Sequence, residues 1–176
     1  MRGGNVHRRR GCGIIAADFK EGQNGMTTSV EAGIGDEFLE RFNGGFTGIL
    51  HWHQLDALWE RLRAQLDGTW HVYAIGEPPP VEPVTAAELD RFIRELDALL
   101  RAEHDEEYCG VVYVDSTDVP SLVKIFDPNN LGSSCGSSGL RVLPGWVLSR
   151  DIPVDLEAAM PPTRSRRRWW RSLFPG

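Results

Sequence analysis

One cysteine and one arginine stand at a spacing used in phosphoryl-transfer chemistry. Cys135 lies in the stretch LGSSCGSSGL, and Arg141 completes the pattern Cys-x5-Arg that cysteine-dependent phosphatases use. In such a site a thiolate attacks phosphorus, while backbone amides and the arginine hold the phosphate oxygens. Glycine and serine suit this cradle, because they allow successive amides to point inward. The stretch is therefore a candidate catalytic loop for a phosphate or acyl substrate.

The sequence after Arg141 argues against that chemistry. A phosphate cradle of this type leads into a helix whose N-terminus stabilises the thiolate. Arg141 is instead followed by Val142-Leu143-Pro144-Gly145, which cannot begin a helix. A flexible or partner-binding loop over residues 127–140 is the favoured interpretation. Its candidate binding residues are Gly132, Ser133, Ser134, Cys135, Gly136, Ser137 and Ser138.

Two histidines and an aspartate form the second candidate site. The segment HWHQLD places His51, His53 and Asp56 close together. If both histidines lie on one strand, their side chains share a face, and Asp56 in the following helix becomes a third ligand for zinc or iron. The alternative needs no metal: His53 caps the helix and His51 lies at the sheet rim. We favour this alternative and expect no cofactor.

The elements that position these residues follow from hydrophobic spacing. Apolar residues three and four positions apart predict helices over residues 53–67 and 85–103. Thr85 and Glu88 form a capping box that fixes where the second helix begins. Strands are predicted over residues 45–51, 69–75, 108–116, 121–128 and 141–150, and a short helix over residues 36–42.

This order, β-α-β-α-β-β-β, predicts a single α+β domain over residues 26–152. We expect a mixed sheet of about five strands with two amphipathic helices on one face. The strand over residues 69–75 carries apolar residues on both faces, which predicts a central position in the sheet. Disordered extensions are expected at both ends of the chain, because neither end shows a continuous apolar pattern.

The charge is distributed unevenly along the chain. Residues 1–25 carry five basic and two acidic side chains, and residues 161–176 carry five arginines and no acid, so the total of −6 leaves −14 on residues 26–160. An acidic body repels nucleic acid phosphates. The acidic run of residues 103–107 is interpreted as the solvated end of the second helix.

The C-terminal extension, residues 153–176, combines positive charge with aromatic rings. Its candidate binding residues are Arg166, Arg167, Arg168, Trp169 and Trp170. This combination holds peptides at anionic lipid headgroups. Binding to RNA, docking on an acidic partner, folding back onto the acidic body and a tail without a role remain open alternatives.

The ends of the chain and the cysteines indicate where the protein works. No apolar run reaches the length of a membrane-spanning helix, so a cytoplasmic protein is expected, with peripheral attachment to a membrane as an alternative. Cys12, Cys109 and Cys135 are too few and too scattered for a disulfide framework. A purine-rich coding stretch before Met26 favours a bacterial translation start there, with residues 1–25 a disordered or mis-assigned extension.

Three functions therefore remain after the sequence is read. The leading hypothesis is a non-enzymatic accessory or adaptor protein that binds a protein partner through its acidic body and the 127–140 loop. Its basic and aromatic tail would contact an anionic surface. The alternatives are a small cysteine-dependent enzyme using Cys135 with Arg141, and a metal-binding protein using His51 and His53.

Overall fold

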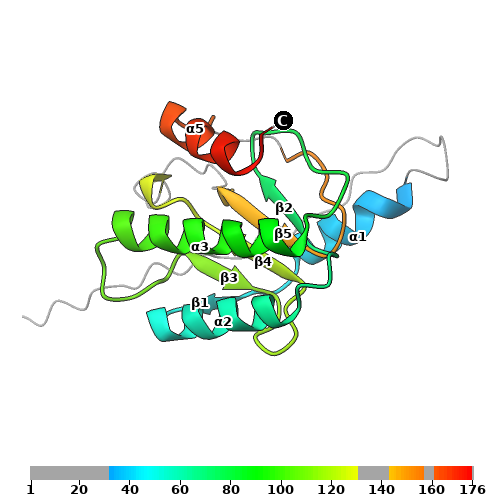
Figure 1. Cartoon of the computed structure of the whole chain (residues 1–176). Coiled ribbons are helices and arrows are strands. Elements are labelled where there is room, and N and C mark those ends of the chain that lie inside the picture. Colours follow the sequence, from blue (N-terminus) through cyan, green and yellow to red (C-terminus); the bar gives the residue numbers. More distant parts are fainter. Residues whose placement is uncertain (1–31, 131–142, 157–160, 176) are drawn as a thin grey trace, which may run out of the picture.

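A computed structural model describes residues 32–130, 143–156 and 161–175. These residues form one α+β domain (Figure 1). The helices are α1 (Ala32–Asn43), α2 (Trp52–Ala64), α3 (Ala86–Glu103) and α5 (Arg164–Leu173), with the 3-10 turn η1 (Pro128–Asn130). The strands are β1 (Thr47–Ile49), β2 (His71–Ala74), β3 (Val112–Val114), β4 (Leu122–Ile125) and β5 (Trp146–Ser149).

The five strands form one sheet in the order β1-β3-β4-β5-β2. The α+β class, the single domain and the five strands are confirmed. Every pairing is antiparallel, so the prediction of a mixed sheet is wrong. The physical reason is the β3-β4 hairpin: its turn reverses the chain, and β1 and β5 each pair antiparallel to one of its two strands.

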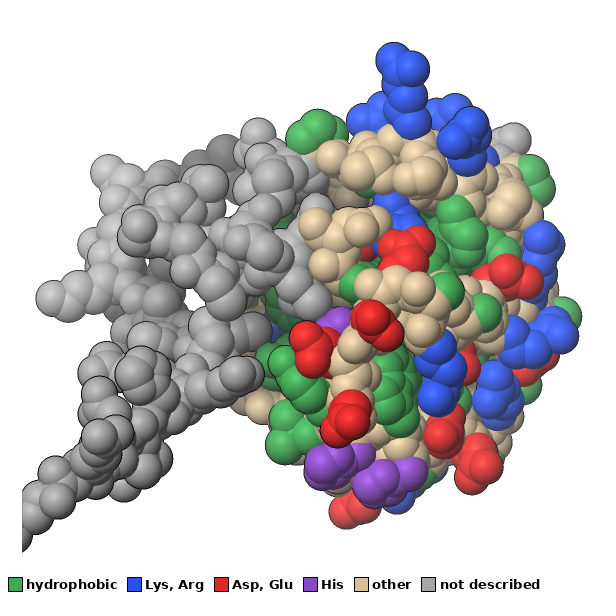
Figure 2. All heavy atoms as spheres, turned by 90° about the vertical axis from the view of Figure 1, so that its left-hand side faces the viewer, with side chains coloured by type: hydrophobic (Ala, Val, Ile, Leu, Met, Phe, Trp, Pro, Cys, Tyr) green, Lys and Arg blue, Asp and Glu red, His purple; other side chains and the backbone are tan. Residues whose placement is uncertain are grey.

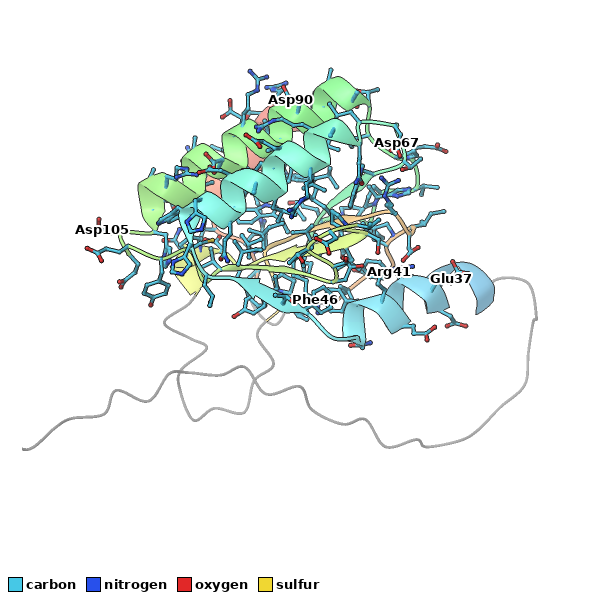
Figure 3. The ribbon with its side chains drawn as sticks, turned by 90° about the horizontal axis from the view of Figure 1, so that it is seen from below. Glu37, Arg41, Phe46, Asp67, Asp90 and Asp105 are labelled. Atoms are coloured by element: carbon cyan, nitrogen blue, oxygen red, sulfur yellow. The ribbon has the colours of Figure 1, made fainter. Side chains whose placement is uncertain are left out.

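Helices α2 and α3 lie side by side on one face of the sheet (Figure 3). Each helix buries one stripe of side chains. The stripe of α2 consists of Leu55, Leu58, Trp59 and Leu62. Helix α3 begins at the predicted capping box: Glu88 accepts from the backbone N–H of Thr85, and Thr85 Oγ1 accepts from the backbone N–H of Glu88. Its buried residues are Leu89, Phe92, Ile93, Leu96, Leu99 and Leu100.

Helix α1 covers part of the opposite face of the sheet (Figure 3). Phe38 and Phe42 are buried there against Tyr73, Leu122 and Val147. Its last turn is held by Lys124 on β4, whose Nζ donates to the carbonyl of Phe42 and lies 4.1 Å from the centre of the Phe42 ring. The sheet therefore separates two apolar layers, and the larger one is on the side of α2 and α3.

Strand β2 is an edge strand, whereas its apolar content predicted a central one. All four of its residues are buried. The coverage comes from outside the sheet: the backbone N–H of Val84 donates to the carbonyl of Trp70, and the backbone N–H of Leu156 donates to the hydroxyl of Tyr73. These segments exclude water from β2. Its side chains are therefore apolar on both faces, as those of a central strand are.

The C-terminal extension is not disordered where it is described. Residues 164–173 form α5, which lies on the same side of the sheet as α2 and α3 (Figure 1). Leu173 is buried in the main core, and Trp169, Trp170 and Phe174 pack against it. The prediction of a disordered C-terminal extension is therefore wrong for this segment, because α5 has an apolar face that the domain buries.

Candidate anion-binding surface

Helix α5 carries two stripes of residues at helical spacing. Positions 166, 169, 170 and 173 hold arginine, two tryptophans and leucine, and positions 164, 167, 168 and 171 all hold arginine. Each set follows the spacing i, i+3, i+4, i+7, which places its members on one side of a helix. The two sets lie on opposite sides. We call them the inner stripe and the arginine stripe.

The inner stripe attaches α5 to the domain through aromatic contacts. The ring of Trp169 lies 5.4 Å from that of Trp146 on β5, and 6.1 Å from that of Phe92 on α3. Trp170 meets the same Phe92 ring edge to face at 6.2 Å. At the other end, Arg91 on α3 donates to the carbonyl of Ser172 at 2.7 Å. These contacts fix which side of α5 faces the solvent.

Arg166 extends the inner stripe with an ion-pair cluster. Its guanidinium binds Asp127 through two bonds, Nε to Oδ2 at 2.7 Å and a second nitrogen to Oδ1 at 2.8 Å. It also donates to both carboxylate oxygens of Glu103, the last residue of α3. Only 7% of the Arg166 side chain is exposed, and 8% of Asp127. The start of α5 is therefore tied to the end of α3 and to the residue that precedes η1.

The pKa values of this cluster reflect its geometry. Burial opposes the charge on Arg166, but the hydrogen bonds that it donates to Glu103 and Asp127 outweigh burial and raise the pKa of Arg166. Hydrogen bonds from Arg166 are also the main reason that the pKa of Glu103 is lowered. Four hydrogen bonds to Asp127 and Glu103 use Nε, Nη1 and Nη2 of Arg166 inside the domain. This arginine therefore has no free edge for an external ligand.

The arginine stripe has the opposite character. Arg164, Arg167, Arg168 and Arg171 are all exposed, and none of them pairs with a carboxylate in the described part of the chain. They line a shallow, open hollow of about 480 Å³ on the outer surface of α5. Figure 2 shows basic side chains gathered at the top of the molecule, where Figure 1 places α5. Acidic side chains lie below them.

The arginine stripe makes α5 less stable than a neutral stripe would. Like charges at i, i+4 on a helix repel, by about 0.2–0.5 kcal/mol for each pair. Arg164 also lies in the first turn, where the helix dipole disfavours a positive charge. By contrast, two exposed arginines of α3 have carboxylate neighbours: Arg94 pairs with Asp90 and Arg101 with Asp97. Of the four arginines in the stripe, only Arg171 lies in the last turn, where the helix dipole favours a positive charge. No ion pair within the described residues accounts for the other three.

The structure divides the predicted tail residues into two groups. Arg167 and Arg168 belong to the exposed arginine stripe, together with Arg164 and Arg171, which the sequence reading left out of the candidate set. Arg166, Trp169 and Trp170 face the domain instead. The sequence does contain a signal for this grouping, because the four arginines repeat at helical spacing once residues 164–171 are taken as a helix.

The histidines are arranged differently from both interpretations of the segment HWHQLD. His51 is the N-cap of α2 and His53 lies in its first turn, so they do not share a strand. Their rings stack, with centroids 5.4 Å apart. Asp56 points elsewhere and pairs with Arg101. Among residues 32–130, 143–156 and 161–175, no three histidine, cysteine or acidic side chains are grouped so that they could hold a metal ion.

The cysteine site lies outside the described residues. This holds for Cys135 and Arg141, for the candidate binding residues 132–138, and for the N-terminal segment 1–25. Cys109 is described: it is a free cysteine, fully buried beneath α3, and burial raises the pKa of its thiol. A thiol with a raised pKa is a poor nucleophile at neutral pH. Cys109 is therefore a core residue.

Comparison with known proteins adds no assignment. No protein-family model, no curated protein and no solved structure matches the chain. Within the described residues, no helix combines the length and apolarity that crossing a bilayer requires. A function therefore has to be inferred from the chemistry of the protein surface.

Proposed function

We propose that the protein is a non-enzymatic accessory protein that attaches to an anionic membrane surface through the arginine stripe of α5. The observation that carries this proposal is the contrast within one helix. Arg166 is held by two carboxylates, whereas Arg164, Arg167, Arg168 and Arg171 face the solvent around one hollow. Unpaired guanidinium groups on a rigid helix form a preorganised surface for anionic groups.

The size of the electrostatic contribution sets the kind of attachment. A basic side chain near an anionic lipid surface contributes about 1 kcal/mol, so four arginines contribute about 4 kcal/mol. That corresponds to a dissociation constant of about 1 mM, which describes a weak and reversible contact. Stable membrane attachment usually requires two signals. A second contact, with a protein partner, supplies the other signal.

The acidic body is suited to that second contact. Residues 26–160 carry a net charge of −14, whereas the arginines of the membrane contact lie together on α5. A protein with opposite charges on two surfaces can bind an anionic membrane and a basic protein partner at once. The 127–140 loop remains a proposed part of the partner contact, and its residues 131–140 lie outside the described structure. On this proposal the protein works in the cytoplasm.

Sedimentation with lipid vesicles tests the membrane contact. The full-length protein is mixed with vesicles of phosphatidylcholine alone or with added phosphatidylglycerol, at low and high salt. We expect binding only to the anionic vesicles, with loss at high salt because mobile ions screen the contact. Changing Arg164, Arg167, Arg168 and Arg171 to Gln should abolish binding and leave the circular dichroism spectrum unchanged, since these side chains are exposed.

A matched control separates the arginine stripe from net charge. Changing Arg61, Arg63, Arg94 and Arg101 on α2 and α3 to Gln removes the same number of charges from a different surface. This variant should keep most of the vesicle binding. The proposal is wrong if both variants lose binding equally, or if the wild type binds no anionic vesicle. Tighter binding to a DNA or RNA oligonucleotide at the same salt concentration would replace the membrane with nucleic acid.

A further inference from the structure

The arginine stripe lines a shallow, open hollow on the outer surface of α5. Arg164, Arg167, Arg168 and Arg171 are the residues that line it. The first and last of these are two helical turns apart, a span of about 10 Å along the axis. A headgroup that rests in this hollow lies within reach of more than one guanidinium group. The hollow can therefore select a ligand by the shape and number of its oxygens, as well as by its charge.

Arginine is the side chain whose shape matters for such a ligand. Its planar fork donates two parallel hydrogen bonds to phosphate oxygens, whereas lysine acts as a point charge. All four positions of the arginine stripe carry arginine, and none carries lysine. A phosphate monoester offers three terminal oxygens and about two negative charges at neutral pH. A phosphodiester offers two such oxygens and one charge, so it engages fewer forks.

The depth of the contact is limited by the inner stripe. Trp169 and Trp170 are half-buried and pack against Phe92, so they are not presented on the outer side of α5. Insertion of indole rings below the headgroups is how basic and aromatic helices usually gain membrane affinity. Helix α5 lacks that means as long as it stays packed. The contact must take its specificity from the headgroups themselves.

We infer that the arginine stripe recognises lipids whose headgroup is a phosphate monoester, such as phosphatidic acid. This inference rests on the proposed function and names the lipid class that the site prefers. Phosphodiester lipids and carboxylate lipids bind by charge alone, and therefore more weakly. At equal surface potential, the wild-type protein binds monoester vesicles about tenfold more tightly, the effect of one additional charge-assisted hydrogen-bonded pair.

A comparison of arginine with lysine tests this inference. Vesicles of phosphatidylcholine containing phosphatidic acid or phosphatidylglycerol are prepared with matched zeta potentials, and binding of the full-length protein is measured at one salt concentration. In one variant Arg164, Arg167, Arg168 and Arg171 are all changed to Lys, and in a second they are changed to Gln. We expect the Lys variant to bind both vesicles equally, at the level of wild type on phosphatidylglycerol. The Gln variant should bind neither.

The outcomes separate the inference from the proposed function. If the wild type binds both vesicle types equally, or the Lys variant keeps the preference for phosphatidic acid, the headgroup inference is wrong and the membrane function stands. If the Gln variant binds like wild type, both are wrong. Glycerol 3-phosphate serves as a soluble competitor. Displacement by it at concentrations similar to those of the accessible lipid would assign the site to a free phosphate monoester and overturn the lipid inference.

Discussion

Two arginines hold the two terminal helices of the domain to the sheet, one from each side. Arg166 ties α5 to Asp127 and Glu103, and Arg41 ties α1 to Asp151 and Ser121. Both clamps use a guanidinium group, but Arg166 binds two carboxylates whereas Arg41 binds one carboxylate and one hydroxyl, and their surroundings differ. The Arg166 side chain is 7% exposed, whereas that of Arg41 is 41% exposed. This difference in exposure predicts that the stability of the fold depends more on the ion pairs of Arg166 than on those of Arg41.

The acidic partners sharpen the contrast. Asp127 is 8% exposed, and within the described residues its charge is compensated by Arg166 and by one bond from the backbone N–H of Asn129. Asp115, which lies 3.8 Å from Arg41, already accepts from the backbone N–H groups of Ser121 and Leu122. Removing Arg166 therefore leaves a buried charge without compensation. Removing Arg41 leaves Asp115 largely satisfied and leaves Asp151, whose side chain is 14% exposed, with more access to water than Asp127 has.

The largest effect is expected from Arg166→Met. Removing one partner of a buried ion pair typically costs about 3–5 kcal/mol, because the other charge stays buried without compensation. We expect the free energy of unfolding to fall by that amount, which is a large part of the stability of a domain of this size. Urea unfolding followed by far-ultraviolet circular dichroism and tryptophan fluorescence measures it.

The matched control for that experiment is Arg167→Met. The neighbouring residue has the same side chain, but it is exposed and belongs to the arginine stripe. Its loss should change the free energy of unfolding by no more than about 0.5 kcal/mol. Equal losses in the two variants would show that Arg166 contributes no more than a surface residue does, and the clamps would then be alike.

Arg41→Met is expected to have a smaller effect. Exposed ion pairs contribute about 0.2–1 kcal/mol, because solvent screens them and both side chains must be ordered. We expect a loss of about 1 kcal/mol in the free energy of unfolding, measured by the same urea titration. High salt should weaken the wild-type contribution and bring the two proteins closer together. A loss as large as that of Arg166→Met would remove the distinction by burial.

The sequence predicts the elements that local patterns determine. The capping box of Thr85 and Glu88 and the apolar stripe behind it fix α3 almost to the residue, and alternating apolar residues with a turn predict the hairpin of β3 and β4. These signals lie within a few residues of the structure that they specify. That is why the α+β class and the strand order along the chain could be predicted.

The packing of α5 and its ion pairs were not predicted, because they depend on contacts between residues that are far apart in the chain. Arg166 meets partners 39 and 63 positions away, and its type alone does not distinguish a buried clamp from a surface charge. The arginine-rich composition of residues 164–171 favours a solvated tail when it is read without periodicity. The local evidence for a helix was present: Thr163 accepts from the backbone N–H of Arg166 and caps α5.

The smallest expected effect concerns acid, and it tests the buried clamp through Glu103. Its pKa is lowered from the ordinary value of 4.5, chiefly by hydrogen bonds from Arg166, with burial opposing. A carboxyl group with a lowered folded-state pKa stabilises the fold fully above its unfolded pKa and loses that contribution as the pH falls through its folded pKa. Glu103→Gln removes the titrating group and retains the size of the side chain.

The advantage of wild type over Glu103→Gln should therefore be constant from pH 7 down to about 5 and shrink below about 4.5. Urea unfolding at a series of pH values measures the two free energies, and their difference isolates Glu103 from the other carboxylates. Because 36% of this side chain is exposed, solvent screening keeps the difference small. In the Arg166→Met background the difference should lose its dependence on pH, since the cause of the shift is gone. A pH-independent difference in the wild-type background would mean that Arg166 is bound by Asp127 alone, and the start of α5 would then be tied by this arginine to the residue before η1 and not to Glu103.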